Sequence, residues 1–377
     1  MKVSILTLHN VLNYGSALQT FATQEVFHRF NLKVEIIDFQ RKDINNIYKN
    51  NFSLDNSSFL KFFISVIKLP YRILSTKKKL RIFKNFLDKN INLSNALYLD
   101  NKDFEKYPVV ADIYCIGSDQ VWNFIWNQGF IEPFYLGFAP ENSFKMSFSS
   151  SFGRKKIPEH ESRIIKPYML RFDSISVREK SGVDILKKIG IRETISILDP
   201  TLMLNNKDWF QFCNNNPFPD EPYLLVYQLN NNKFFDNIIK IIAKAKGLKI
   251  IKITLELKKI FNKDTIVCPS VDKWLTYFYH ASYVITDSFH GTVFSVNFNK
   301  QFCVIAPPKF SDRLTNILSI TDLENRIIDN QNQIDCMLNT DIDYSKVNKI
   351  IQQERNKAHI FLERSIIKAK VLNKYAE

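Results

Sequence analysis

The residues best suited to chemistry in this 377-residue chain are a histidine and an arginine that each follow a short apolar run. His290 comes after the run 282–286 and stands beside Gly291, at the start of a predicted helix. Histidine can transfer protons near neutral pH, and a helix N-terminus favours phosphate. Arg178 follows the run 174–177, and its planar guanidinium suits a carboxylate or a phosphate. Pairing of Arg178 with Glu179 or another carboxylate is an equally good interpretation.

Further groups that could bind an anion lie close to this histidine in the sequence. The segment 284–295 has the small and hydroxyl-bearing residues expected where a helix N-terminus holds phosphate. After the next apolar run, the segment 307–313 supplies two cations. The predicted anion-binding residues are Ser288, Gly291, Thr292, Lys309 and Arg313.

Two other segments place polar residues directly after apolar runs in the first half of the chain. The run 2–9 is followed by Asn13, Tyr14 and Gly15, where a turn and a helix start are expected. The run 112–117 is followed by Ser118, Asp119, Gln120 and Trp122, which could hold hydroxyls and offer a ring for sugar stacking. Ordinary helix caps and a core tryptophan are the alternative interpretation of both segments.

The apolar runs alternate with helical stretches, which predicts an α/β fold with mostly parallel sheets covered on both faces. The predicted strands fall into two series, so two Rossmann-like domains are expected: 1–203, with a helical basic insert at about 50–105, and 204–340. The last stretch, 341–377, is predicted to be a closing helix. The strands are predicted at 2–9, 34–39, 112–118, 145–151, 174–179, 223–229, 248–254, 265–269, 282–288 and 301–306.

The insert contains a basic and apolar stretch at 59–89. It carries nine Lys or Arg residues against one Asp, interleaved with Phe, Ile and Leu. Such a stretch can lie on an anionic membrane surface. A helix that packs its apolar stripe on the domain and exposes its charges is the alternative.

The overall composition is that of a folded protein with a preference for anionic partners. Lys and Arg exceed Asp and Glu by 52 − 38, which gives a net charge of +14. The five cysteines have no zinc-ligand spacing, so no metal site is predicted and a reducing cytoplasm is expected. No stretch of about 18 apolar residues and no secretion signal is present, which favours a cytoplasmic protein, either free or peripheral on the membrane.

Four motifs, taken together and in order, resemble the polysaccharide pyruvyl transferase family across nearly the full chain. They are NYGSALQ, GSDQVWN, SVRE and TDSFHG, which contain Asn13, Ser118, Arg178 and His290. The resemblance implies a fold like the B-type glycosyltransferases, with the site between the two domains. It also implies phosphoenolpyruvate as donor and a sugar acceptor, free or lipid-linked, in cell-surface polysaccharide synthesis such as that of a capsule.

The product of such a reaction would be a pyruvate ketal that bridges two sugar hydroxyls. In the family an Arg and a His act at the site, and these match Arg178 and His290. Either Lys309 or Arg313 matches the further cation. No cofactor beyond the co-substrate is implied.

Two other functions remain open from the sequence. One is a nucleotide-sugar-dependent glycosyltransferase of similar fold, in which Asp287 would be the acidic residue of the second domain. The other is a non-enzymatic protein that binds membranes or nucleic acid through its net charge. The sequence contains no nucleic-acid-binding motif, so nucleic acid is not expected as a partner.

Overall fold

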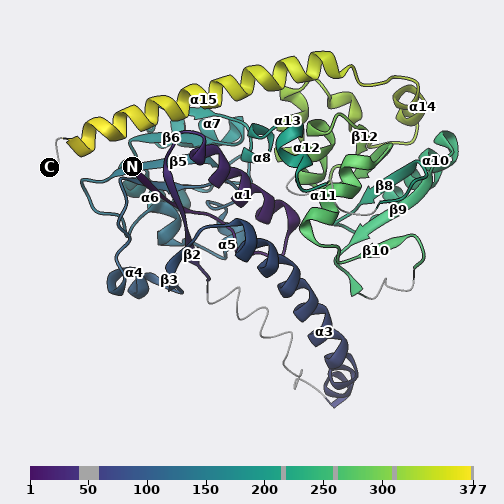
Figure 1. The fold of residues 1–377 in the computed structure, drawn as a ribbon, viewed down its shortest axis with the longest axis horizontal. Helices are drawn as coiled ribbons and strands as arrows, with labels where there is room; N and C mark the ends of the chain where they lie inside the picture. Colours follow the sequence, from purple (N-terminus) through teal and green to yellow (C-terminus); the bar gives the residue numbers. More distant parts are fainter. Residues whose placement is uncertain (42–58, 214–217, 258–261, 308–311, 375–377) are drawn as a thin grey trace.

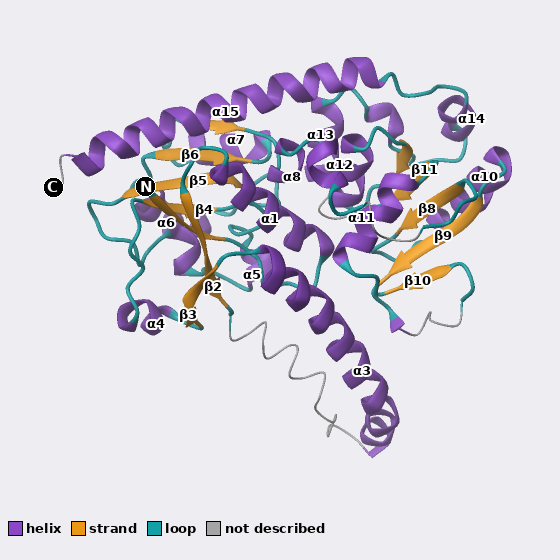
Figure 2. Ribbon diagram, in the orientation of Figure 1, coloured by secondary structure: helices purple, strands orange, loops and turns teal. Residues whose placement is uncertain are grey.

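The computed structural model describes residues 1–41, 59–213, 218–257, 262–307 and 312–374. They form two α/β domains side by side, each built on a parallel sheet with helices on its faces (Figures 1 and 2). The predicted fold class is therefore confirmed. Phosphate-bearing and sugar ligands of such sheets bind beyond the carboxyl ends of the strands, so the strand order decides where a site can form.

The first sheet has the order β3-β2-β1-β4-β5-β6-β7, and its neighbouring strands pair in parallel. Its central strands are buried on both faces, which explains their continuous apolar sequence. The order reverses between β1 and β4, and this reversal opens a crevice at the carboxyl edge. The strands are β1 (Lys2–Leu6), β2 (Lys33–Phe39), β3 (Leu93–Tyr98), β4 (Ile113–Ile116), β5 (Phe144–Ser150), β6 (Ser174–Val177) and β7 (Thr194–Ser196).

The second sheet has the order β10-β9-β8-β11-β12, again with parallel pairing. Its order reverses between β8 and β11, so the second domain has a crevice of the same kind. The strands are β8 (Tyr223–Tyr227), β9 (Lys249–Thr254), β10 (Thr265–Val267), β11 (Tyr283–Thr286) and β12 (Gln301–Val304). The chain passes from one sheet to the other between Ser196 and Tyr223, the connection in which the domain boundary was predicted.

Helices cover both sheets, and several begin directly at the carboxyl ends of strands. Asn13 and Ser288 cap the two helices that follow β1 and β11. The helices of the first domain are α1 (Tyr14–His28), α3 (Phe59–Asn90), α4 (Asn101–Lys106), α5 (Phe124–Asn127), α6 (Glu159–Met169), α7 (Lys180–Lys188), α8 (Pro200–Met203) and α9 (Asn206–Phe210). Those that follow are α10 (Lys233–Lys246), α11 (Val271–His280), α12 (Phe289–Asn297), α13 (Asp312–Ile320), α14 (Gln333–Leu338) and α15 (Tyr344–Lys374).

Helix α3 contains the basic stretch 59–89 of the predicted insert, and it projects away from the body of the molecule (Figure 1). Residues 50–58 of that insert lie outside the described residues. Its C-terminal half packs on the domain through Phe83, Phe86 and Leu87, as the packing interpretation expects. Further towards its N-terminus, Tyr71 and Leu74 are exposed. The helix therefore combines a packed C-terminal half with exposed apolar side chains at Tyr71 and Leu74.

Aromatic side chains join the two domains behind the crevices. Tyr14 of α1 stacks on Trp274 of α11, with ring centroids 5.5 Å apart, and its hydroxyl donates to the carbonyl of Pro269 at 2.7 Å. The closing helix α15 runs along both domains (Figure 1). Near its start Tyr344 donates to the carbonyl of Ser295, and near its end Asn373 donates to the carbonyl of Asp112.

Candidate functional site

The carboxyl ends of the strands at the two sheet reversals face one another and enclose a small cavity. We call it the interdomain cavity; its volume is about 110 Å³. The first domain contributes the loops after β1 and β4, and the second contributes the loop after β8 and the start of α12. The lining residues are Leu8, Val11, Asn13, Ser16, Asp119, Gln120, Trp126, Leu229, Ser288, Phe289, His290 and Arg313.

A buried guanidinium and three carboxylates lie next to this cavity. Arg178 is 3% exposed; its Nε donates to Glu179 Oε1 at 2.9 Å and its Nη1 to Asp199 Oδ2 at 2.8 Å. Nη2 lies 3.8 Å from Asp119 Oδ1 and has no hydrogen-bond partner within the described part of the chain. Burial opposes the charge of Arg178, but these carboxylates hold its pKa above the usual value. Arg178 is thus a permanent cation bound mainly by the protein's own acids, and it does not line the cavity itself.

Asp199 connects this arginine with the histidine. Besides the contact with Arg178, Asp199 Oδ2 accepts from Ser118 Oγ at 3.2 Å and lies 3.9 Å from His290 Nε2. Its Oδ1 accepts from the amide and hydroxyl of Thr201, because Asp199 caps α8. Sequence reasoning missed Asp199, since it lies in a polar stretch that reads as a domain junction. The signal that could have found it is an Asp-Pro pair directly after the apolar run 195–198.

The protonation states follow from burial and from these neighbours. Burial opposes ionisation of Asp199, but the charges of His290 and Arg178 and the bonds from Thr201 and Arg178 lower its pKa below the ordinary value. Burial, opposed by Asp199 and Asp119, lowers the pKa of His290 to about 4. Without a bound anion, the histidine is therefore neutral at pH 7 and Asp199 is charged. His290 Nε2 is buried and has no hydrogen-bond partner among the described residues.

The loop after β1 fixes the position of this histidine from the opposite domain. Asn13 caps α1 by accepting from the amide of Gly15 at 2.8 Å. Gly15 lies directly against the imidazole of His290 and leaves no room for a side chain. Ser16 then donates to Asp119 Oδ2 at 2.7 Å, which ties α1 to the loop after β4.

On the second domain, the start of α12 and one cation face the cavity. Ser288 lines it, and the first amides of α12 have no partner within the helix. The amide of Gly291 donates to Ser288 Oγ and the hydroxyl of Thr292 to the Ser288 carbonyl, so these two residues shape the turn. Arg313 lines the cavity with its guanidinium 5.6 Å from the ring centroid of Phe289. Lys309, the other predicted cation, lies outside the described residues.

The structure corrects three of the predicted acceptor-binding residues. Trp122 is completely buried and its indole donates to the carbonyl of Phe134 at 2.8 Å, so it cannot stack on a sugar. Tyr14 is also buried and belongs to the domain junction, and Ser118 is buried beneath the cavity against Asp199. The tryptophan that lines the cavity is Trp126, which is 37% exposed.

The carboxylate of Asp287 also accepts hydrogen bonds from within the protein. Its two carboxylate oxygens accept from the amides of Leu229 and Asn230, at 2.7 and 2.8 Å, and from the Asn230 side chain. Asp287 therefore fixes the loop after β8, whose Leu229 lines the cavity. Those bonds occupy the carboxylate that a nucleotide-sugar site would use.

The described residues contain no group of three or more His, Cys, Asp or Glu side chains arranged to hold a metal ion. Across the same residues, no helix has the length and apolarity needed to span a bilayer.

Residues 13–308 match the family model described as "Polysaccharide pyruvyl transferase". A search of curated proteins finds no match.

Solved structures resemble the chain in fold. A UDP-N-acetylglucosamine 2-epimerase is 9% identical, with a TM-score of 0.52 over 98% of this chain and 96% of that one. The spinosyn forosaminyltransferase SpnP is 8% identical, with a TM-score of 0.50 over 98% and 99%. The UDP-GlcNAc 2-epimerase of Methanocaldococcus jannaschii is 14% identical, with a TM-score of 0.49 over 91% and 93%. The first two indicate a two-domain fold of the B-type glycosyltransferase kind.

Proposed function

Because the chain belongs to the polysaccharide pyruvyl transferase family, we propose that it transfers the enolpyruvyl group of phosphoenolpyruvate to a sugar and forms a pyruvate ketal. The observation that carries the proposal is the meeting of His290 and Arg313 in one small polar cavity between the domains. Ordinary ligand pockets have volumes of about 300–1,000 Å³. A cavity of about 110 Å³ suits a three-carbon anion better than a nucleotide.

The second domain supplies the groups that would hold the donor. Arg313 offers positive charge, and the start of α12 offers N–H donors, to the phosphate and carboxylate. Arg178 does not line the cavity and would act indirectly. Its positive charge would compensate the negative charges of Asp199 and Asp119, which would otherwise repel an anionic donor. This differs from direct donor binding by Arg178, since the hydrogen bonds of its guanidinium go to the carboxylates of Glu179 and Asp199.

In this proposal, His290 moves the proton. The negative charge of the donor favours the imidazolium form, so donor binding would raise the pKa of His290 from about 4. The protonated ring would then give its proton to the methylene carbon, and a sugar hydroxyl would attack the central carbon. The proton of this first hydroxyl is taken up by the departing phosphate. Attack by the second hydroxyl then closes the ketal, and its proton returns to His290. Asp199 would keep the ring oriented throughout.

The acceptor would approach from the first domain. Asn13, Asp119, Gln120 and Trp126 line that side of the cavity and offer amides, a carboxylate and an exposed indole. Gln120 Oε1 already accepts from Asn123, which leaves its amide nitrogen for a hydroxyl. An aromatic ring beside such polar groups is a common arrangement in sugar-binding sites.

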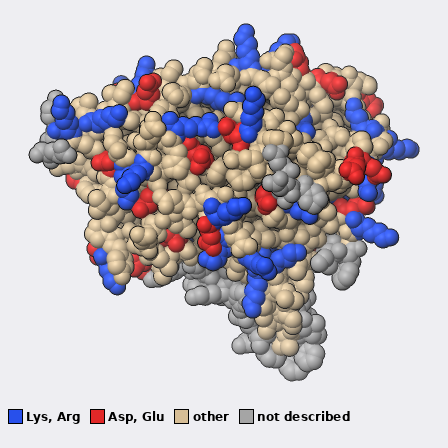
Figure 3. All heavy atoms as spheres, viewed as in Figure 1, with Lys and Arg blue, Asp and Glu red and all other residues tan. Residues whose placement is uncertain are grey.

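We also propose that α3 brings the enzyme to the cytoplasmic face of an anionic membrane, where a lipid-linked acceptor would be met. Lys77, Lys78 and Arg81 are exposed along this helix, and Leu74 is 62% exposed. Figure 3 shows Lys and Arg side chains gathered where α3 leaves the body of the molecule. Positive charge beside exposed apolar groups favours anionic lipid surfaces.

The experiment that tests the catalytic proposal compares donors. Phosphoenolpyruvate at about 100 times its Kd should stabilise the protein by about 2.7 kcal/mol, while UDP-N-acetylglucosamine should leave the melting curve unchanged. His290→Ala should retain donor binding but lower phosphate release with a sugar acceptor by roughly 10²–10⁴-fold. Stabilisation by the nucleotide sugar alone would support the glycosyltransferase alternative.

A further inference from the structure

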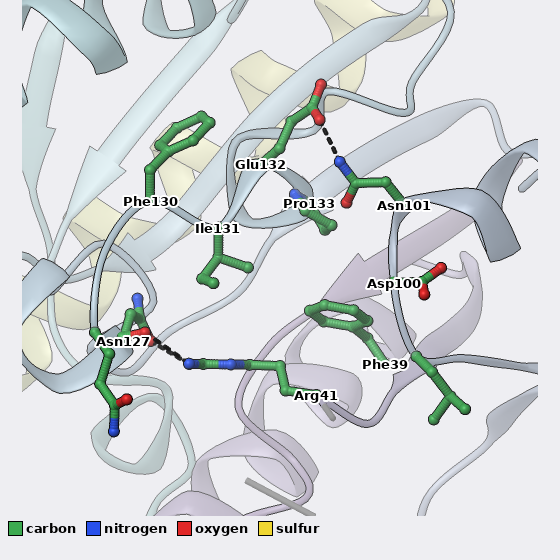
Figure 4. A pocket seen from close by; sticks show the side chains of 11 residues that line it. Phe39, Arg41, Asp100, Asn101, Asn127, Phe130, Ile131, Glu132 and Pro133 are labelled. Carbon is green, nitrogen blue, oxygen red and sulfur yellow. Dashed lines mark hydrogen bonds between the residues drawn. The ribbon is translucent and has the colours of Figure 1, made fainter. Parts of the chain in front are cut away.

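A second and larger cavity lies on the first domain, and no step proposed above uses it. We call it the distal cavity; its volume is about 540 Å³. Its walls come from the carboxyl ends of β2 and β3 and from the loop that follows α5 (Figure 4). The lining residues are Phe39, Arg41, Leu99, Asp100, Asn101, Asn127, Gln128, Phe130, Ile131, Glu132 and Pro133.

The position of the distal cavity relates it to the interdomain cavity. In the first sheet, β3 and β2 are the neighbours of β1 on one side, and all these strands are parallel. Their carboxyl ends therefore lie along the same edge of the sheet as the site. A ligand that extends from the site along this edge would next meet the distal cavity.

Trp126 and Arg41 form the wall between the two cavities. The indole of Trp126 lines the interdomain cavity, while the next residues, Asn127 and Gln128, line the distal one. The guanidinium carbon of Arg41 lies 5.7 Å from the centroid of the Trp126 ring. Arg41 is buried and donates to Asn127 Oδ1 at 2.6 Å and to the Asn127 carbonyl at 2.7 Å. This wall is therefore a fixed part of the domain.

The lining of the distal cavity matches a sugar better than an anion or a lipid tail. Phe39 and Phe130 provide apolar ring surface, and Asn101, which donates to Glu132, provides a hydrogen-bonded amide and carboxylate on one side (Figure 4). Arg41 with its Asn127 partner provides a second polar group elsewhere on the wall. Hydroxyl groups can both donate to the carboxylates and accept from the amides, which an anion cannot do. The acidic groups Asp100 and Glu132 disfavour a phosphate, and the polar groups disfavour a hydrocarbon chain.

We propose that the distal cavity binds the sugar of the acceptor that lies next to the one receiving the pyruvyl group. The inference rests on the proposed function, because it assumes that an acceptor sugar approaches the donor from the first-domain side of the interdomain cavity. It commits the enzyme to an oligosaccharide acceptor of at least two sugars. The bond between the two sugars would pass over Trp126.

The test measures how glycan length affects binding. The protein is saturated with phosphoenolpyruvate and applied to an immobilised series of mono-, di- and trisaccharide fragments of bacterial surface polysaccharides. Wild type should retain di- or trisaccharides at least about tenfold more tightly than the monosaccharide with the same terminal sugar. Asn101→Ala, an exposed position, and Phe130→Ala should each remove most of this preference. Lys102→Ala, exposed on the same helix but outside the cavity, is the matched control and should behave as wild type.

The outcomes separate this inference from the proposed function. Phosphoenolpyruvate affinity, measured by calorimetry, should be equal in wild type and in all three variants. Failure of wild type to bind phosphoenolpyruvate would refute the proposed function, whereas a length preference that depends on Asn101 would still support the sugar site. Retention of no glycan, equal retention of short and long glycans, or a preference that survives Asn101→Ala overturns the inference.

Discussion

A Cβ atom on Gly15 would lie 1.9 Å from Nδ1 of His290, although the two residues belong to different domains. No side chain fits at position 15 unless the imidazole moves. Because Gly15 has no side chain, the imidazole of His290 can lie directly against the start of α1.

Gly15→Ala is therefore expected to displace His290 and to lower turnover while the fold persists. A misplacement of about 1 Å can cost roughly 100-fold in rate, and we expect a loss of this order in phosphate release. Circular dichroism and phosphoenolpyruvate binding check that the variant is folded. A folded variant with wild-type turnover would show that the position of His290 is not critical.

Asp199→Asn should disrupt both the buried ion pairs and the orientation of the histidine. Removing one partner of a buried pair usually costs about 3–5 kcal/mol, so the melting temperature should fall clearly. At a temperature where the variant is folded, turnover should fall further than donor affinity, because Asp199 contacts His290 and Arg178 but does not line the cavity.

The control for this variant is Asp184→Asn, an exposed position on α7. It removes the same charge from the surface and should change neither the melting temperature nor turnover. If Asp199→Asn matches this control in a kinetic comparison, Asp199 has no part in the reaction.

The pH dependence of stability offers a test of the buried, neutral His290. Its pKa is about 4 in the folded protein, whereas an exposed histidine has a pKa near 6.5. Between these pH values the unfolded chain binds more protons than the folded one, so this residue makes the protein less stable as the pH falls from about 6.5 to about 4. His290→Gln should remove that contribution and flatten the curve of melting temperature against pH.

The exposed His160→Gln variant serves as the control in that series, and its curve should overlay that of wild type. Equal slopes for wild type and His290→Gln between pH 6.5 and 4 would mean that the ring is not held neutral by burial. Calorimetry in buffers of different ionisation enthalpy should also detect proton uptake when phosphoenolpyruvate binds to wild type, but not to His290→Gln.

Replacement of Arg178 and of Arg313 by lysine should have different effects on stability and donor binding. Arg178→Lys loses the planar fork that contacts Glu179 and Asp199, so it should lower the melting temperature as well as turnover. Arg313→Lys should weaken phosphoenolpyruvate binding with little change in the melting temperature, because Arg313 lines the cavity. Identical profiles for the two variants would contradict this division of roles.

Membrane association through α3 can be measured by flotation with liposomes. Wild type should bind vesicles rich in anionic lipid and be released as salt rises. The double variant Lys77→Glu, Arg81→Glu should bind much less, since both residues are exposed on α3. Lys78 is left intact, because its amine donates to the carbonyl of Val267 in the second domain. Flotation that is unaffected by the double variant would exclude this surface.

The sequence predicted the parts of the fold that depend on burial. All ten predicted strands are present, and the central ones were recognisable because a strand covered on both faces is continuously apolar, as in β4 and β8. Two strands with little buried surface, β3 and β7, were not predicted, although β10, which has the same intermediate exposure as β7, was. In β3 only Tyr98 is buried, and β7 has three residues of intermediate exposure. Such edge strands are held by their neighbours rather than by their own apolarity.

For the candidate site, the sequence indicated some of the residues that line the interdomain cavity, but not how they contact one another. His290 and Arg313 could be expected because they follow apolar strands, and strand ends are where ligands bind. The sequence did not single out Trp126, because the segment around α5 is irregular and has no helical or strand period that shows which indole is exposed. The role of Asp199 depended on a contact with the other domain, which local sequence does not encode.

The anchoring of α15 at both ends has a consequence for how the two halves of the site stay together. Its Tyr344 is bonded to the second domain and its Asn373 to the first, while Arg355 donates to the carbonyl of Leu202 between them. A helix fixed in this way acts as a tether, and a tether keeps each domain at a high effective concentration for the other. The contact between Gly15 and His290 therefore depends on this tether as well as on the affinity of the two domains for each other.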